Sequence, residues 1–135
     1  MPVSDCHLID LPKISDPRGN LTVVEQDSSI PFKIKRVYYI YDVPVGAERG
    51  SHAHKNLQQF IIPMAGSFRV KLFDGRQEKT FYLDSPSKGL YICPLIWRTI
   101  DSYSANSLCT VLASEHYDEL DYVRDFDEFL DYVNN

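Results

Sequence analysis

Two histidines separated by one residue, His52 and His54, have the residue type and spacing best suited to catalysis in this chain. Side chains two residues apart on a β-strand point to the same face, so the two imidazoles are expected to lie side by side. An imidazole titrates near neutral pH and can both take and give a proton. Gln59 follows in the next apolar segment and is expected opposite them. The spacing therefore predicts an interior site for proton transfer.

Two glycines frame this segment, and the frame resembles the first motif of the cupin superfamily. That motif is a glycine, five residues, His-x-His, an acid and a second glycine, and Gly46 and Gly66 fit its spacing. Gln59 stands where a metal-binding cupin has its acid, and Arg98 stands where the second motif has its last histidine. Two neutral imidazoles beside an arginine make a poor site for a divalent cation. We therefore expect no metal and no other cofactor, with the histidines left for proton transfer.

Short strands separated by turns must position these residues. Turn signals recur about every 8–12 residues, which favours a sandwich or barrel over alternating strands and helices. The segments rich in β-branched and aromatic residues are 21–26, 34–41, 57–63, 67–73, 80–83, 89–94 and 107–114. Near the C-terminus, Phe126, Phe129, Leu130 and Val133 recur at helical spacing after Asp125, the expected N-cap. We predict one all-β domain over residues 1–135 with a short C-terminal helix.

Composition and charge limit the functions open to this chain. It has 135 residues, 44% of them hydrophobic, and a net charge of −5, which indicates one globular domain and argues against nucleic-acid binding. No run approaches the ~18 apolar residues of a membrane helix, and no signal peptide is expected at residues 1–11. The cysteines at positions 6, 93 and 109 form no CxxC motif. Free thiols of this kind favour a reducing, cytoplasmic location.

The acidic residues are concentrated at one end of the chain. Residues 115–135 carry eight acids and one arginine, whereas residues 1–114 carry eleven acids and thirteen bases. The body of the protein is therefore slightly basic although the whole chain is acidic. Such a body can hold a small anion.

Separated motifs extend a second resemblance over nearly the whole chain. They lie at 16–21 (DPRGNL), 30–40 (IPFKIKRVYYI), 49–54 (RGSHAH), 83–86 (LDSP), 89–91 (GLY), 112–114 (LAS) and 117–119 (YDE). Together they resemble the sugar 3,4-ketoisomerases of the WxcM-like, FdtA/QdtA type, which act on dTDP-4-keto-6-deoxyglucose. The resemblance implies a cupin double-stranded β-helix, or small jelly-roll barrel, and a homodimer with an exchanged N-terminal strand. It also implies a cytoplasmic role in making deoxyamino sugars (3-acetamido-3,6-dideoxyhexoses) for surface glycans such as the lipopolysaccharide O-antigen.

The implied reaction moves a carbonyl from C4 to C3 of the sugar through an enediolate. A base must remove the C3 proton, and the resemblance places that proton acceptor at His52. His54 is the expected second acid/base, and Arg49 is expected to stabilise a developing oxyanion or the diphosphate. Only one of Tyr38 and Tyr39 can face the interior, because neighbouring side chains alternate along a strand. We expect that one to be Tyr39.

Four further residues are expected to contact the nucleotide sugar: Arg18, Lys35, Gln59 and Arg98. Lys35 and Arg36 alternate across a strand, so at most one of them points inward. A nucleotide-sugar 3,5-epimerase-like enzyme and a non-catalytic sugar-binding cupin remain alternatives. An epimerase requires a His/Asp base dyad and a tyrosine elsewhere, and no such pattern is evident in the sequence. The C4 configuration of the product, galacto or gluco, is left open.

Overall fold

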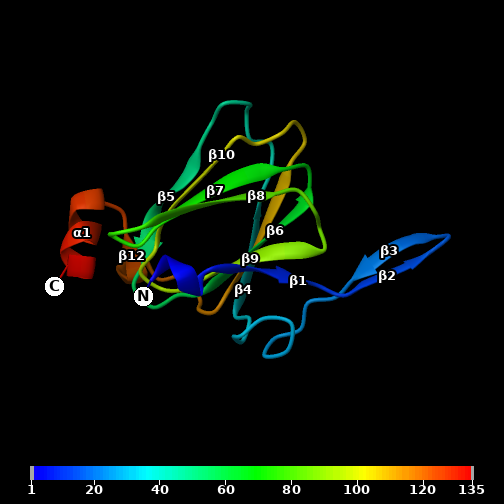
Figure 1. Ribbon diagram of the computed structural model, residues 1–135, viewed down its shortest axis with the longest axis horizontal. Coiled ribbons are helices and arrows are strands. Elements are labelled where there is room, and N and C mark those ends of the chain that lie inside the picture. The colour runs from blue at the N-terminus through cyan, green and yellow to red at the C-terminus, as the bar shows by residue number, and fades with distance from the viewer. Residues whose placement is uncertain (1, 135) are drawn as a thin grey trace.

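The computed structural model describes residues 2–134, and two antiparallel five-stranded sheets form its body (Figure 1). The first sheet has the order β1-β9-β6-β11-β4, with β1 (His7–Asp10), β9 (Lys88–Ile92), β6 (Gln59–Ala65), β11 (Leu108–Ala113) and β4 (Arg36–Ile40). The second has the order β12-β5-β10-β7-β8, with β12 (Tyr122–Val123), β5 (Arg49–His54), β10 (Trp97–Asp101), β7 (Phe68–Phe73) and β8 (Glu78–Leu83). The predicted all-β architecture is confirmed.

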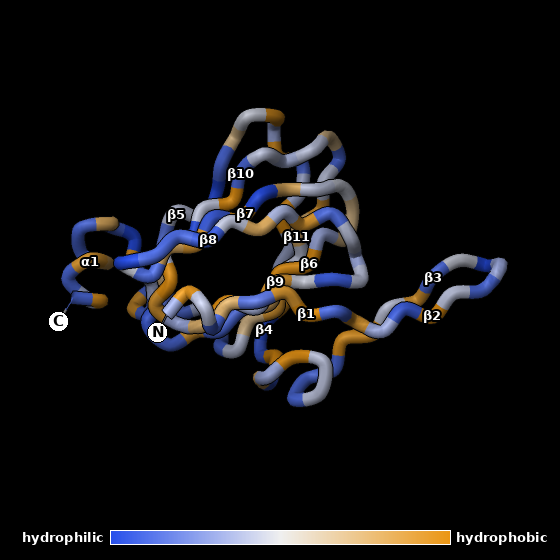
Figure 2. Tube along the Cα trace, in the orientation of Figure 1, coloured by the Kyte–Doolittle hydropathy of each residue, from blue (hydrophilic) through white to orange (hydrophobic). Residues whose placement is uncertain are grey.

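Side chains that alternate along the strands point inward and form the core between the two sheets. In β7, Phe68, Val70 and Leu72 are buried, while the residues between them are partly exposed. The first five residues of β6 and the last four of β9 are buried, and Figure 2 shows apolar residues there. A strand with one apolar face needs a second layer to cover that face, so these patterns require two sheets packed face to face.

A hairpin and a short helix extend from this body. Strands β2 (Lys13–Asp16) and β3 (Gly19–Thr22) form a hairpin that projects away from the two sheets (Figure 1). Helix α1 (Phe126–Asn134) begins after Asp125, whose carboxylate accepts a hydrogen bond from the Asp127 backbone at 2.9 Å. Its apolar face packs on β7 and β10, with Phe129 fully buried beside Trp97. The predicted helix and its N-cap are confirmed.

Some strand predictions differ from the structure. The segment predicted at 21–26 ends as a strand at Thr22, and the remainder is irregular apart from one bridge between Gln26 and Ile30. Strands β2, β10 and β12 were not predicted, because none of them carries a long run of β-branched or aromatic residues. Two 3-10 turns, η1 (Val3–Asp5) and η2 (Glu119–Asp121), complete the elements. Within residues 2–134, none of the helices has the length and apolar character needed to span a membrane.

Candidate active site

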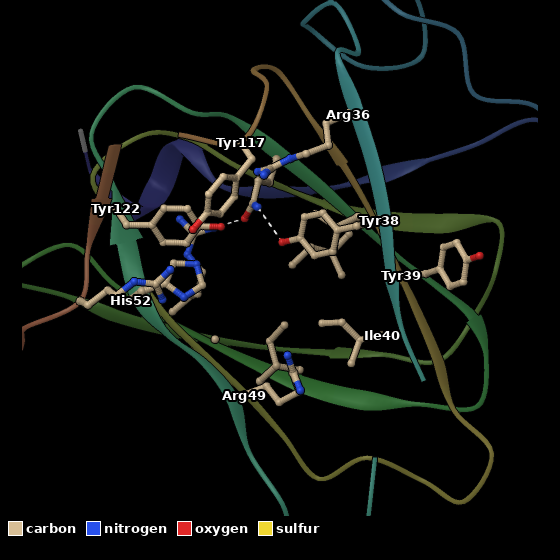
Figure 3. A pocket seen from close by; sticks show the side chains of 15 residues that line it. Arg36, Tyr38, Tyr39, Ile40, Arg49, His52, Tyr117 and Tyr122 are labelled. Carbon is tan, nitrogen blue, oxygen red and sulfur yellow. Dashed lines mark hydrogen bonds between the residues drawn. The ribbon is translucent and has the colours of Figure 1, made fainter. Parts of the chain in front are cut away.

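A cavity of about 450 Å³ opens between the two sheets (Figure 3). Strands β4, β5, β6, β10 and β11 supply most of its wall, and the segment from Tyr117 to Arg124 closes one side. Four of its lining residues are cations: Arg36, Arg49, Arg98 and Arg124. A cavity of this size with an excess of positive charge is suited to a small anionic ligand.

The two histidines project inward from β5, as their spacing predicts. His52 lines the cavity, while His54 lies behind it with no exposed surface. Their Nε2 atoms are 3.1 Å apart, and the rings are perpendicular. A bulge at Gly50, where φ is +76°, shifts the register between β5 and β10. The bulge allows Arg49 and His52 to contribute to the same cavity wall.

Burial keeps both imidazoles neutral at physiological pH. Loss of hydration, reinforced by the positive charge of Arg98, lowers the pKa of His52 from 6.5 to about 3. The same two causes lower the pKa of His54 still further below its ordinary value. A neutral imidazole has one ring nitrogen with a free lone pair. His52 can therefore accept a proton from a molecule in the cavity.

Arg98 and Gln59 occupy the positions where a metal-binding cupin carries ligands. Arg98 is fully buried on β10, opposite His52 in the strand register. Its Nη1 donates a hydrogen bond to Gln59, and Gln59 Nε2 lies 3.0 Å from the Tyr38 hydroxyl. The guanidinium and the amide thus fill the space with donors and positive charge, which does not fit a divalent cation. Within residues 2–134, no group of three histidine, cysteine, aspartate or glutamate side chains is arranged around a common point.

The structure reverses the expected orientations of two tyrosines. Tyr38 points into the cavity, and burial raises the pKa of its hydroxyl (Figure 3). Tyr39 points to the outer side of β4, is 61% exposed and packs against Tyr41. The prediction that Tyr39 faces the site is therefore wrong. The β4–β11 register places Arg36, Tyr38 and Ile40 on the inner face.

The same alternation corrects the choice between Lys35 and Arg36. Lys35 is exposed, and its Nζ lies 3.2 Å from the Glu115 carboxylate at the surface. Arg36 turns inward, with its guanidinium 5.3 Å from the centre of the Tyr38 ring and 5.6 Å from that of Tyr117. Its Nε and Nη2 atoms are buried without a hydrogen-bond partner. The prediction of an inward-pointing Lys35 is wrong, and Arg36 takes that place.

Arg18 is the predicted site residue that lies apart from the others. It lies in the turn of the β2–β3 hairpin, its side chain is 90% exposed, and it pairs with Asp16 at 2.8 Å. It does not line the cavity of its own chain. Within this chain, the structure thus brings together His52, Arg49, Gln59 and Arg98, with His54 behind them, and leaves Arg18 outside.

The segment before the C-terminal helix contributes site residues that sequence analysis missed. The Tyr122 ring packs against both imidazoles, with centroids 5.1 Å from His52 and 4.3 Å from His54. Arg124 lies over Tyr122 and pairs with Glu119 at 2.6 Å. Strand β12 is only two residues long, so no periodicity in the sequence marks this segment.

This segment also supplies a carboxylate partner for His54. The sequence did not reveal this partner. The Asp121 carboxylate lies 3.1 Å from His54 Nδ1. This His/Asp pair sits behind His52 and away from the cavity, so it differs from a base dyad that faces a substrate. His54 and Asp121 lie 67 positions apart in the chain, so their spacing in the sequence does not reveal the pair.

Comparisons with known proteins agree with this architecture. Residues 4–134 match the model of the family described as FdtA, WxcM-like, C-terminal. The chain belongs to this family. Among FdtA-family relatives, a TDP-4-oxo-6-deoxy-alpha-D-glucose-3,4-oxoisomerase from Aneurinibacillus thermoaerophilus is 45% identical over 126 residues, which are 93% of this chain and 91% of the relative.

Solved structures give the same result for the fold. The sugar 3,4-ketoisomerase QdtA from Thermoanaerobacterium thermosaccharolyticum, solved in complex with TDP, superposes with a TM-score of 0.95 at 42% identity, covering 98% of this chain and 97% of QdtA. The rmlC epimerase of Mycobacterium tuberculosis superposes with a TM-score of 0.78 at 16% identity, covering 90% and 69% of the two chains. The second likeness concerns the fold alone. The predicted cupin fold and the predicted family are confirmed.

Proposed function

We propose that this FdtA-family protein is a 3,4-ketoisomerase that acts on TDP-4-keto-6-deoxyglucose. The observation that carries the proposal is the neutral His52 imidazole at the wall of a cavity lined by arginines. QdtA, at 43% identity, has been solved as a histidine variant in complex with TDP-4-keto-6-deoxyglucose. A neutral base surrounded by fixed cations is what proton abstraction next to a ketone requires.

The reaction is a balanced transfer of protons within one sugar. His52 removes the proton from C3, and the carbonyl oxygen on C4 takes up the resulting negative charge. The enediolate then loses the O3 proton, O4 gains one, and C4 is reprotonated to give the 3-keto sugar. Arg98 and Arg49 stabilise the negative oxygens during these steps. His54 has no cavity surface, so it exchanges protons with the sugar through His52.

Arg36 is assigned to the diphosphate of the nucleotide. Its buried Nε and Nη2 atoms have no hydrogen-bond partner, and phosphate oxygens accept such donors in pairs. Lys35 directly precedes Arg36 in the chain and faces outward, so it is the matched control. Arg36→Gln should weaken TDP binding about 10- to 100-fold, the value of one or two charge-assisted hydrogen bonds, whereas Lys35→Gln should leave it unchanged. Equal affinities for the two variants would contradict the assignment.

Turnover without a metal is the expected result of incubating the purified protein with TDP-4-keto-6-deoxyglucose. The amide of Gln59 and the guanidinium of Arg98 stand where metal ligands would be needed. NMR should show a 3-keto sugar, and prior treatment with a chelator should leave the rate unchanged. Activity that is lost on chelation and restored by a divalent cation would contradict metal independence. TDP binding without turnover would instead indicate the sugar-binding alternative.

Trapping the product with an aminotransferase, followed by NMR, would define its C4 configuration. We place the reaction in deoxyamino sugar synthesis for surface glycans such as the O-antigen, and the protein in the cytoplasm. The three cysteines are free and buried, as suits a reducing compartment. A product that no aminotransferase accepts at C3 would argue against this pathway role.

We further propose that two copies form a dimer through the N-terminal segment with an exchanged strand. The β2–β3 hairpin leaves the body of the protein and exposes Ile14 and Leu21, which are paired in register (Figure 1). Arg18 near its tip is too far from its own cavity to line it, so a second copy offers the site that it can reach. Light scattering at micromolar concentration should give twice the mass of the chain. A monomer would contradict the proposal.

A further inference from the structure

A line of hydrogen-bonded side chains leads from the cavity into the protein. His52 Nε2 lies 3.1 Å from His54 Nε2, and His54 Nδ1 lies 3.1 Å from Asp121 Oδ2. The other carboxylate oxygen of Asp121 accepts a hydrogen bond from the Asn56 backbone at 2.8 Å. The Asp121 carbonyl also accepts one from the Lys55 backbone at 2.9 Å. The carboxylate is thus held against the loop that follows the two histidines.

The chemistry of these groups determines where each proton lies. An ionised carboxylate only accepts hydrogen bonds, so His54 must carry its proton on Nδ1. His54 is neutral, and its Nε2 is therefore a bare acceptor. The hydrogen bond between the two rings then requires His52 to donate from Nε2. Neutral His52 is left with its lone pair on Nδ1.

We infer that Asp121 is a positioning residue that sets the tautomers of both histidines and thereby makes Nδ1 of His52 the atom that accepts the substrate proton. The inference rests on the proposed function. When Nδ1 takes the C3 proton, the Nε2 proton of His52 can shift toward His54, and the Nδ1 proton of His54 toward Asp121. The positive charge is spread toward a carboxylate, and no other reactant is needed.

The tautomers of the two histidines matter because the opposite pair would place a proton on Nδ1 of His52. That atom could then not accept a proton from the substrate. Arg98, Arg124, Tyr122 and the Glu119 carboxylate also lie around His52. The two guanidinium groups only donate hydrogen bonds, the Tyr122 ring packs against the imidazole, and Glu119 accepts hydrogen bonds from Arg124 and Tyr117. None of these four side chains hydrogen-bonds a ring nitrogen of His52, whose ring hydrogen bond runs to His54. Among the described residues, Asp121 is the carboxylate that contacts either imidazole at hydrogen-bond distance. Removing its charge therefore removes what selects one tautomer.

Asp121→Asn is the direct test, because asparagine keeps the size and can still accept from the Asn56 backbone. Its amide nitrogen would then face His54 Nδ1 and favour the opposite tautomer in both rings. We expect kcat to fall by about 10²–10⁴-fold while KM and the affinity for TDP stay within about twofold of wild type. Asp118→Asn is the matched control, since Asp118 caps the same 3-10 turn and is exposed. It should leave kcat unchanged.

Nitrogen NMR of labelled histidines measures the tautomer of each ring. If Asp121 had only a structural role, its replacement would leave these tautomers unchanged. In the wild type, His52 should be protonated on Nε2 and bare on Nδ1, and in Asp121→Asn this pattern should reverse. A wild-type His52 that carries its proton on Nδ1 would overturn the inference, even if the variant failed to fold. Unchanged kcat in Asp121→Asn, or a loss of kcat with unchanged tautomers, would also overturn it. A wild type with the expected tautomers but no ketoisomerase activity would instead overturn the proposed function.

Discussion

Replacing His52 with asparagine should lower kcat by about 10²–10⁴-fold and leave the affinity for TDP nearly unchanged. Asparagine is polar and similar in size, but it cannot accept a proton at neutral pH. The cations that line the cavity come from other residues, so nucleotide binding should persist. Steady-state kinetics and calorimetric titration with TDP measure the two quantities separately.

Solvent deuterium gives an independent reading of the same substitution. If His52 removes the C3 proton, the wild-type enzyme in D2O should place deuterium at C3 or C4 of the sugar. His52→Asn should show no exchange at C3, whereas His116→Asn, at an exposed position, should behave as wild type. Exchange that persists at C3 in His52→Asn but vanishes in His54→Asn would mean that the base is the other histidine. Full turnover in both variants would rule out a histidine mechanism.

The free energy of unfolding should fall steeply as the pH is lowered from about 6.5 toward 4. In the unfolded chain the two site histidines take up protons near pH 6.5, but in the folded chain burial lowers the pKa of His52 to about 3 and that of His54 further. The unfolded state thus binds more protons in this window, and stability is lost as the pH falls. Each histidine contributes about 1.4 kcal/mol per pH unit. Lowering the pH by two units then lowers the free energy of unfolding by about 5 kcal/mol, which is a large part of a typical domain's stability.

Urea denaturation at a series of pH values measures this slope. His54→Asn should reduce it, because one of the two buried imidazoles no longer titrates in the unfolded chain. His116→Asn, at an exposed position, should leave it unchanged and serves as the control. Stability that stays level between pH 6.5 and 5 would contradict the neutral, buried state of the two histidines.

Much of the site could be predicted because it depends on short-range spacing. His52 and His54 share a face since side chains alternate along a strand, whatever the strand pairs with. The replacement of metal-ligand positions by Gln59 and Arg98 is also visible in the sequence once the glycine frame is aligned. The helix after Asp125 follows from periodicity and a local cap. Each of these features depends on neighbours in the chain.

The inner face of β4 could not be predicted in the same way. Alternation implies that Arg36 and Tyr38 share one face, and Lys35 and Tyr39 the other. Which face is buried depends on the register with β11, whose paired residues lie 69 to 77 positions away in the chain. A shift of one residue would exchange the two sets. The wrong choices of Tyr39 and Lys35 both have this origin.

The sequence by itself determined that His52 and His54 share one face of a strand and that Gln59 and Arg98 stand at metal-ligand positions of an all-β fold. Only the tertiary structure decided which residues complete the site. Asp121 and Tyr122 reach the histidines through the β12–β5 pairing, although 67 positions separate Asp121 from His54. Such contacts leave no period in the sequence, because they form only when distant segments close around a common core.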